Sequence, residues 1–171
     1  MKGLQAIAAS NKHKDDTLIL KATLCHVING NRLLLKEASR GISKGKWNGP
    51  GGKFEKGETP EQCAIRETFE ETGITMHKPF FHGKLYFFMD GKRKLSIEGF
   101  LFSTRNFSGR IKSSEEGPVK WFSARRLPLK RMWDDDQYWL NLMLSGKRFD
   151  AYIYYDKRNK KVVEYRILIK S

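Results

Sequence analysis

Hydrophobic and polar positions along the chain predict a series of β-strands. The run TLILKATLCHVI, which starts at Thr17, is rich in apolar and β-branched residues, and RLLLKE follows Asn29-Gly30. Two such runs around Asn-Gly predict a β-hairpin. Further strands are expected at about 82–90, 94–102 and 119–123, with a turn at Asp90-Gly91. The runs FDAYIYYD and VVEYRILI predict a closing hairpin around 157–160.

Two segments carry helix signals instead. Thr59 is a good N-cap, Pro60 suits the first helical position, and Gln62 completes a capping box. This helix is expected to reach about Thr72 and to end at Gly73. The run DDDQYWLNLMLSGK predicts a second helix, capped by an aspartate of the triplet 134–136.

Neither repeats nor a linker divide the chain. We therefore expect one α/β (α+β) domain with a mixed sheet over 17–171, preceded by a flexible N-terminal arm at 1–16. The length of 171 residues suits a single domain that needs neither disulfides nor a structural metal for its core.

Composition indicates which cellular compartment and which classes of binding partner to expect. The formal net charge of +14 favours anionic partners such as nucleotides, nucleic acid or acidic membranes, although a solvated basic surface is an equal alternative. Cys25 and Cys63 show no CxxC spacing, which predicts buried free thiols in a reducing compartment. Without a long apolar run or a secretory leader, we expect a soluble cytoplasmic protein with no membrane partner.

The first helix carries a cluster of acids. Glu67, Glu70 and Glu71 are spaced i, i+3 and i+4, so they fall within one sector of the helix, and Ile65 and Phe69 are expected to face the core from the opposite side. The mutual repulsion of the acids is relieved if a divalent cation sits among them, and carboxylate oxygens suit Mg²⁺ or Mn²⁺. The alternative is a solvated acidic face.

A longer motif surrounds these acids. The stretch GKFEKGETPEQCAIRETFEETGI, from Gly52 to Ile74, resembles the Nudix box, G-x5-E-x7-R-E-U-x-E-E-x-G-U, in which U is a bulky aliphatic residue. Every fixed charged and glycine position is present. Thr68 stands where an aliphatic residue is usual, and we expect this departure to cost a little stability rather than catalysis.

The resemblance implies the Nudix fold, a mixed β-sheet sandwiched between helices with the box as a loop–helix–loop. It also implies hydrolysis of a nucleoside diphosphate linked to another moiety. By the family pattern, Glu67, Glu70 and Glu71 correspond to metal-binding glutamates, a main-chain carbonyl near Gly52 could be a further ligand, and two residues support the loop and helix, namely Glu58 and Arg66.

The chemistry of the pyrophosphate bond agrees with this set of residues. Divalent ions neutralise the charge that develops when water attacks a polyanion, and a nearby carboxylate can take the proton. Candidates for that base are the box glutamates or Glu116 in the loop SSEEGPVKW. Glu115 and Glu116 could equally form an exposed acidic turn.

The flanking segments KGKWNGPGGK and MWDDDQYW resemble the oxidised-purine nucleoside triphosphatases of the MutT type, especially the animal form. This resemblance covers the chain from about Thr23 to the C-terminus. Trp139 is expected to pack behind the pocket, and Asp134 stands where the animal enzymes carry proline. The match implies base-reading positions at Asn48 and at the pair Asp135–Asp136. It also implies a base-stacking position at Trp133 and an aromatic wall at Phe87.

These residue types are chemically suited to a purine. An Asn amide offers both a donor and an acceptor, and adjacent carboxylates in an apolar pocket repel, which raises one pKa and turns that Asp into a donor. Read alone, Trp133 and Trp139 are better explained as ordinary core aromatics, and the aspartates as a helix N-cap. Their joint appearance with the segment WNG favours the base pocket instead.

Three functions compete. The first is an Mg²⁺-dependent pyrophosphohydrolase, with Mn²⁺ as a substitute, that converts oxidised purine (d)NTPs such as 8-oxo-dGTP to the monophosphate and pyrophosphate and so sanitises the nucleotide pool for DNA. The second is a Nudix hydrolase for ADP-ribose, dinucleoside polyphosphates or capped RNA. The third is an RNA-associated protein, either a decapping enzyme or a catalytically silent nucleotide sensor. The intact glutamates disfavour the silent sensor. We expect a monomer that binds a nucleoside triphosphate, with nucleic acid not favoured.

Overall fold

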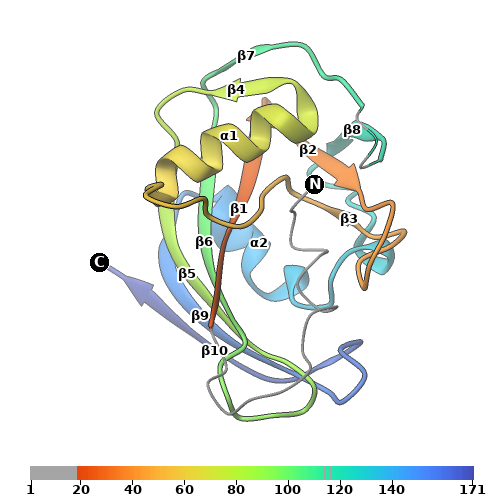
Figure 1. Ribbon diagram of the computed structural model, residues 1–171, viewed down its shortest axis with the longest axis vertical. Coiled ribbons are helices and arrows are strands. Elements are labelled where there is room, and N and C mark those ends of the chain that lie inside the picture. The colour runs from red at the N-terminus through yellow and green to blue at the C-terminus, as the bar shows by residue number, and fades with distance from the viewer. Residues whose placement is uncertain (1–18, 114, 116) are drawn as a thin grey trace.

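The computed structural model describes residues 19–113, 115 and 117–171. Figure 1 shows the arrangement of its elements. The helices are α1 (Pro60–Thr72), α2 (Asp136–Leu144) and the short 3-10 helix η2 (Leu129–Arg131). The strands are β1 (Leu20–Asn29), β2 (Arg32–Glu37), β3 (Trp47–Asn48), β4 (Ile74–Met76), β5 (Phe80–Phe88), β6 (Ile97–Thr104), β7 (Phe107–Gly109), β8 (Val119–Ser123), β9 (Arg148–Tyr155) and β10 (Val162–Lys170). The expected arm at 1–16 and the candidate base Glu116 lie outside the described residues.

The main sheet is mixed, as expected. Its strands lie in the order β10-β9-β5-β6-β1-β2-β3, and β8 pairs with β2. β1 runs parallel to β6, and β5 runs parallel to β9, whereas the other neighbours are antiparallel. A separate two-stranded sheet joins β4 to β7. The predicted strand at 119–123 is confirmed, and those at 82–90 and 94–102 are present but shifted by two or three residues.

Local signals account for the turns and for α1. Gly30 adopts φ +60° between β1 and β2, and Asp90 and Gly91 adopt φ +59° and +66° in the second predicted turn. The capping box is present: the Thr59 hydroxyl accepts from the Gln62 amide at 3.2 Å, and the Gln62 side chain accepts from the Thr59 amide at 2.9 Å. Gly73 ends the helix in the left-handed region.

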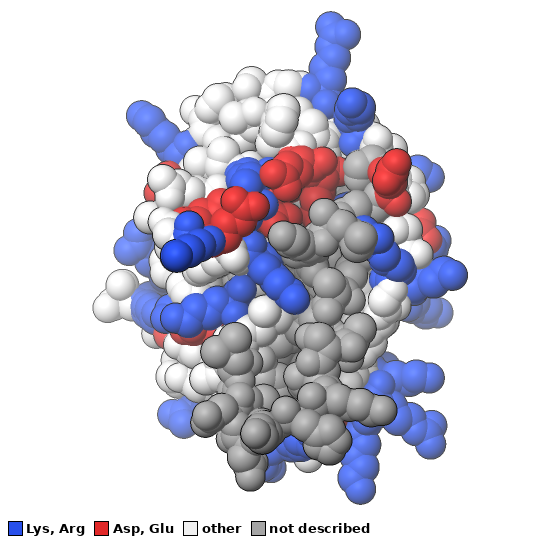
Figure 2. All heavy atoms as spheres, in the orientation of Figure 1, with Lys and Arg blue, Asp and Glu red and all other residues white. Residues whose placement is uncertain are grey.

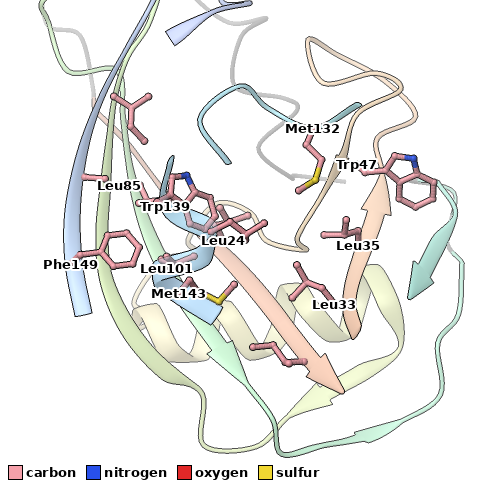
Figure 3. Close-up of a cluster of buried hydrophobic side chains, with 14 of the residues drawn as sticks. Leu24, Leu33, Leu35, Trp47, Leu85, Leu101, Met132, Trp139, Met143 and Phe149 are labelled. Carbon is pink, nitrogen blue, oxygen red and sulfur yellow. The ribbon is translucent and has the colours of Figure 1, made fainter. Parts of the chain in front are cut away.

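Two hydrophobic clusters lie on opposite faces of the sheet, because side chains alternate along each strand. In β1, Leu24 and Ile28 face one cluster, whereas Cys25 and Val27 face the other. The first cluster is covered by α2, which contributes Trp139, Leu140 and Met143. Figure 3 shows Trp139 and Met143 among the buried side chains of this cluster. The second includes Ala64 of α1. The sheet therefore lies between the two helices, as expected.

Both cysteines are buried and free, as predicted. The Cys25 thiol donates to the Ala64 carbonyl at 3.7 Å, and the Cys63 thiol donates to the Lys53 carbonyl at 3.5 Å. Burial raises the pKa of each thiol to about 12. Both thiols are therefore protonated at neutral pH.

Within the described part of the chain, the longest helices are too short and too polar to cross a bilayer.

Candidate active site

The acids of α1 do not lie where the sequence pattern placed them. Glu67 and Glu71 are each only 3% exposed, whereas Phe69 is 56% exposed. The expectation that Phe69 faces the core is therefore wrong. The buried stripe has helical spacing and consists of small residues together with the two acids, namely Cys63, Ala64, Glu67, Thr68, Glu71 and Thr72.

This stripe is buried because partners neutralise both glutamates. The buried amine of Lys36, on β2, forms an ion pair with Glu71, and the Gly51 amide donates to the same carboxylate at 3.0 Å. Buried charges need such partners. Thr68 packs as expected despite its hydroxyl, which lies 3.2 Å from the Met76 sulfur and is fully buried.

A glycine loop lies directly against the acidic stripe. The Gly52 carbonyl accepts from the Thr23 amide at 2.8 Å, so β1 fixes the loop. A Cβ on Gly52 would lie 2.5 Å from the carboxyl carbon of Glu67. Since real Cβ atoms essentially never approach so closely, only glycine allows the loop and Glu67 to occupy these positions.

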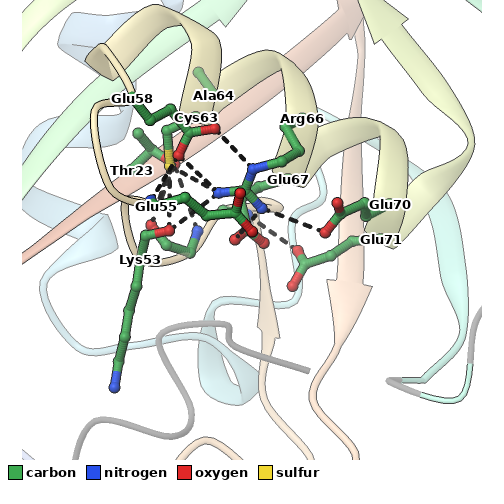
Figure 4. Close-up of polar contacts among 12 residues, drawn as sticks. Thr23, Lys53, Glu55, Glu58, Cys63, Ala64, Arg66, Glu67, Glu70 and Glu71 are labelled. Carbon is green, nitrogen blue, oxygen red and sulfur yellow. Dashed lines mark hydrogen bonds and ion pairs between the residues drawn. The ribbon is translucent and has the colours of Figure 1, made fainter.

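Arg66 connects the loop, Glu58 and the helix (Figure 4). Its guanidinium donates to Glu58 at 2.7 and 2.9 Å, to Glu67 at 2.8 Å and to Glu70 at 3.3 Å. It also donates to the Lys53 carbonyl at 3.1 Å. The hydrogen bond from Arg66 lowers the pKa of Glu58, and the bond to Glu58 raises the pKa of Arg66. Both groups therefore stay charged and keep the loop against α1.

The donors are of the type that a hard divalent ion prefers, namely carboxylate and carbonyl oxygens on and beside one helix. Figure 2 shows an acidic band across the face on which α1 lies, with Lys and Arg over much of the surrounding surface. Among the residues that the structure describes, no three His, Cys, Asp or Glu side chains gather closely enough to hold a metal ion. Glu67 and Glu71 instead contact Arg66 and Lys36, and the Glu70 side chain is 57% exposed.

The aspartates at the start of α2 form a second, deeply buried group. Asp135 accepts from the Trp139 indole at 2.7 Å and from the Tyr155 hydroxyl. Asp136 accepts from the Trp133 amide at 3.1 Å. Burial raises the pKa of both carboxyls, and the charge of Asp135 raises that of Asp136 further. The expected rise in pKa for one member of this pair is therefore present.

Sequence reasoning missed two members of these networks, Lys36 and Tyr155. Lys36 follows three leucines in a short apolar strand, so the strand's alternation could have placed it on a buried face. Tyr155 ends the alternating run of β9 and is 1% exposed. Its hydroxyl needs a buried partner, which Asp135 provides.

Trp133 lies on the wall of a cavity of about 500 Å³. Its ring meets that of Tyr155 edge-on at 5.7 Å, and the Lys46 amine lies 5.1 Å from its centre. The predicted wall residue Phe87 is partly buried against the first core cluster. The cavity is strongly basic, with cations from three parts of the chain, namely Lys46, Lys130, Arg158, Lys160 and Lys161.

Asn48 lies beside the acidic helix. Its amide oxygen accepts from the Gly49 amide at 2.8 Å. Asn48, Lys36 and Glu71 line the same small cavity of about 20 Å³. One of the predicted base-reading residues and one of the predicted metal-binding glutamates are therefore neighbours in space.

Asp134 anchors the turn that carries Trp133. Its carboxylate accepts from the amine of Lys161, which directly precedes β10, at 2.8 Å and from the amide of Val162, the first residue of β10, at 2.9 Å. Burial alone would raise the pKa of Asp134, but these donors hold it below its usual value. Asp134 therefore bonds to Lys161 and Val162 and not to the pair Asp135–Asp136.

Comparison with known proteins identifies the family of the chain. Residues 19–143 match the model of the NUDIX domain. The oxidized purine nucleoside triphosphate hydrolase of Danio rerio is 37% identical over 145 residues, which cover 85% of this chain and 92% of the relative. The enzyme of the same name from Mus musculus is 38% identical over 130 residues, covering 74% and 81%. The crystal structure of a MutT protein from Bacillus halodurans superposes with a TM-score of 0.76 at 27% identity, covering 87% of this chain and 97% of that one.

Proposed function

Because the chain belongs to the Nudix hydrolase family, we propose that it hydrolyses oxidised purine nucleoside triphosphates, such as 8-oxo-dGTP, to the monophosphate and pyrophosphate. The observation that carries this proposal is the shared cavity of Asn48 and Glu71. It brings a group able to read a base within reach of the acids suited to a phosphate chain. The names of the relatives support the same substrate class.

Base recognition is assigned to Asn48, Trp133 and the aspartate pair. Asp135 accepts two side-chain hydrogen bonds, which favour its charged form, whereas Asp136 accepts only a backbone amide and lies beside that charge. Asp136 is therefore the carboxyl that keeps a proton and donates it to the purine edge. Stacking on Trp133 would add about 1–3 kcal/mol of binding free energy, and Phe87 would contribute to the wall of the base pocket.

The phosphate chain is assigned to the acidic face of α1. Glu67, Glu70 and Glu71, with the Gly52 carbonyl, would hold Mg²⁺, for which Mn²⁺ could substitute. When bound, the ion supplies neutralising charge at the phosphate oxygens. Glu70 is the most exposed of the three carboxylates, and Arg66, at 3.3 Å, orients it. We therefore assign Glu70 as the group that takes the proton from the attacking water. Arg66 and Glu58 keep the loop in register with the helix.

This activity would remove oxidised purines before a polymerase incorporates them, which is a role in nucleotide-pool sanitation and DNA repair. Two buried free thiols suit the reducing cytoplasm, and we place the protein there.

The direct test is pyrophosphate release with Mg²⁺ over a substrate panel of 8-oxo-dGTP, dGTP, dCTP, ADP-ribose and capped RNA. The largest kcat/KM is expected for 8-oxo-dGTP. Chelation should abolish turnover, and Mn²⁺ should restore it. A preference for ADP-ribose or capped RNA would overturn the proposed substrate while leaving the hydrolase class in place.

Two variants assign the roles. Glu70→Gln should remove turnover without loss of substrate binding. Asp135→Ala should raise KM for oxidised purines more than for pyrimidines, because Asp135 is assigned to recognition of the base and not of the phosphate chain. An equal effect on both substrate classes would remove Asp135 from base recognition.

A further inference from the structure

The outer edge of β10 is unusually open for a strand at the end of a sheet. Within the described part of the chain, β10 pairs only with β9 and forms one end of the main sheet (Figure 1). Three of its apolar side chains are strongly exposed: Val163 at 66%, Tyr165 at 49% and Ile169 at 61%. Natural edges are normally short, charged or covered, because an open edge offers unpaired N–H and C=O groups to another strand.

The regular part of this edge begins after a bulge. The register between β10 and β9 shifts between Val162 and Glu164, and from Glu164 to Lys170 it continues without interruption. Tyr165, Ile167 and Ile169 alternate along this segment and share the α2 side of the sheet. Tyr165 stacks on Tyr138 of α2 at 4.1 Å, and Ile167 packs against the first core cluster. The exposed stripe is thus continuous with that core.

The sequence of this segment, EYRILIK, is complementary to itself in the antiparallel direction. If two copies pair about Ile167, Glu164 of one lies opposite Lys170 of the other, and Tyr165 lies opposite Ile169. Arg166 faces Leu168, and the two Ile167 residues meet at the centre. Opposite charges and aromatic–aliphatic pairs are the cross-strand combinations that stabilise a sheet.

We propose that β10 pairs with β10 of a second copy of this chain, centred on Ile167, to form a two-fold symmetric dimer with one continuous sheet. Such a contact uses the same surface on both partners and therefore closes at two copies. This revises the monomer expected from sequence. The apolar stripes of the two copies would meet on the α2 side and join the two first core clusters.

The charged residues at the two ends of the segment already have partners within the chain. Glu164 lies 2.7 Å from Arg93, and both side chains are more than half exposed. Lys170 lies 2.8 Å from Asp150. The Glu164–Arg93 pair is exposed on both sides and contributes little to stability, so it does not oppose pairing across the new edge. The Asp150 side chain is 17% exposed, so its pair with Lys170 is the stronger of the two.

A charge-swap experiment tests the register directly. In sedimentation equilibrium at physiological ionic strength, the full-length protein should dimerise. Glu164→Lys places Lys opposite Lys170, and Lys170→Glu places Glu opposite Glu164, so each single variant should dissociate about tenfold more readily or worse. An equimolar mixture of the two single variants restores both opposite-charge pairs and should dimerise, as should the double variant.

A matched pair of variants controls for added charge. Ile169→Lys places a charge within the paired segment and should weaken the dimer, whereas Val163→Lys lies at the bulge and should not. All variants should retain the hydrolase activity of the unmodified protein, which shows that they fold. The proposal is overturned if the full-length protein is monomeric at every concentration, or if the mixed single variants fail to associate. It is also overturned if dimers appear only after residues 1–18 are removed, since that segment would then be the occupant of the edge.

Discussion

Gly52 shows how a single missing side chain can set the geometry of the site. The loop carbonyl is tied to β1, and Arg66 holds Glu67, so an added methyl group would displace the Glu67 carboxylate from its position beside the loop. Gly52→Ala should therefore lower the free energy of unfolding by about 1–3 kcal/mol and reduce kcat sharply. Urea denaturation and initial rates measure the two effects.

Gly45→Ala is the matched control for that substitution. Gly45 has φ +78° but open space around the position of a Cβ. It should lose about 1 kcal/mol through backbone strain alone and leave kcat unchanged. Equal kinetic losses in both variants would contradict a specific role for the Gly52–Glu67 approach.

The buried pair of Lys36 and Glu71 implies that a residue proposed to bind the metal also supports the fold. Glu71→Gln removes the negative charge opposite a buried ammonium, so the free energy of unfolding should fall by about 3 kcal/mol. Adding Lys36→Met to Glu71→Gln should recover part of that loss, because the unpaired positive charge of Lys36 is then removed as well. Chemical denaturation of the two variants decides this, and equal stability of Glu71→Gln and the unmodified protein would contradict it.

The raised pKa of Asp136 predicts a pH dependence. A carboxyl with a raised folded-state pKa is protonated well above the usual value of 3.8, and its proton is lost as pH rises through that higher pKa. If this proton is donated to the purine, kcat/KM for 8-oxo-dGTP should fall on the alkaline side. Asp136→Asn keeps an amide donor at every pH and should flatten that limb. An identical limb in Asp136→Asn would assign it to another group.

At the scale of elements, Asp134 joins the α2 turn to β10. Asp134→Ala leaves the Val162 amide without its acceptor and should cost about 1–2 kcal/mol. The folded-state pKa of Asp134 is lowered, so its contribution is present above the unfolded value of 3.8 and is lost as pH falls below it. Thermal unfolding at neutral and acidic pH should therefore show a smaller difference between Asp134→Ala and the unmodified protein in acid. A difference that grows in acid would contradict this sign.

The predictability of each element follows from where its signals lie. α1 could be bounded from sequence because its capping box and its glycine end are local. β3, β4 and β7 could not, because strands of two or three residues depend on partners distant in the sequence. Phe69 was misplaced since the pattern treats every glutamate as exposed. The partners that bury Glu71 come from β2 and from the glycine loop, whereas Glu67 pairs with Arg66 of the same helix and lies against Gly52.

At the scale of the whole molecule, the charge of +14 should act on encounter with substrate. A basic surface around an acidic band attracts a polyphosphate over a distance set by salt (Figure 2). Raising ionic strength from about 0.01 M to about 0.15 M shortens that distance from about 30 to about 8 Å. We expect kcat/KM for 8-oxo-dGTP to fall severalfold while kcat changes little. Stopped-flow rates that do not respond to salt would show that the charge has no part in association.

The complete burial of Cys25 and Cys63 affects how this protein responds to oxidising conditions. Peroxides and disulfides attack the thiolate, and at neutral pH a thiol with a pKa of about 12 is almost wholly in the unreactive form. The oxidants that damage guanine in free nucleotides would therefore find no accessible sulfhydryl here, since the chain has only these two cysteines. The proposed hydrolysis of oxidised nucleotides would therefore persist under the oxidising conditions that produce its substrates.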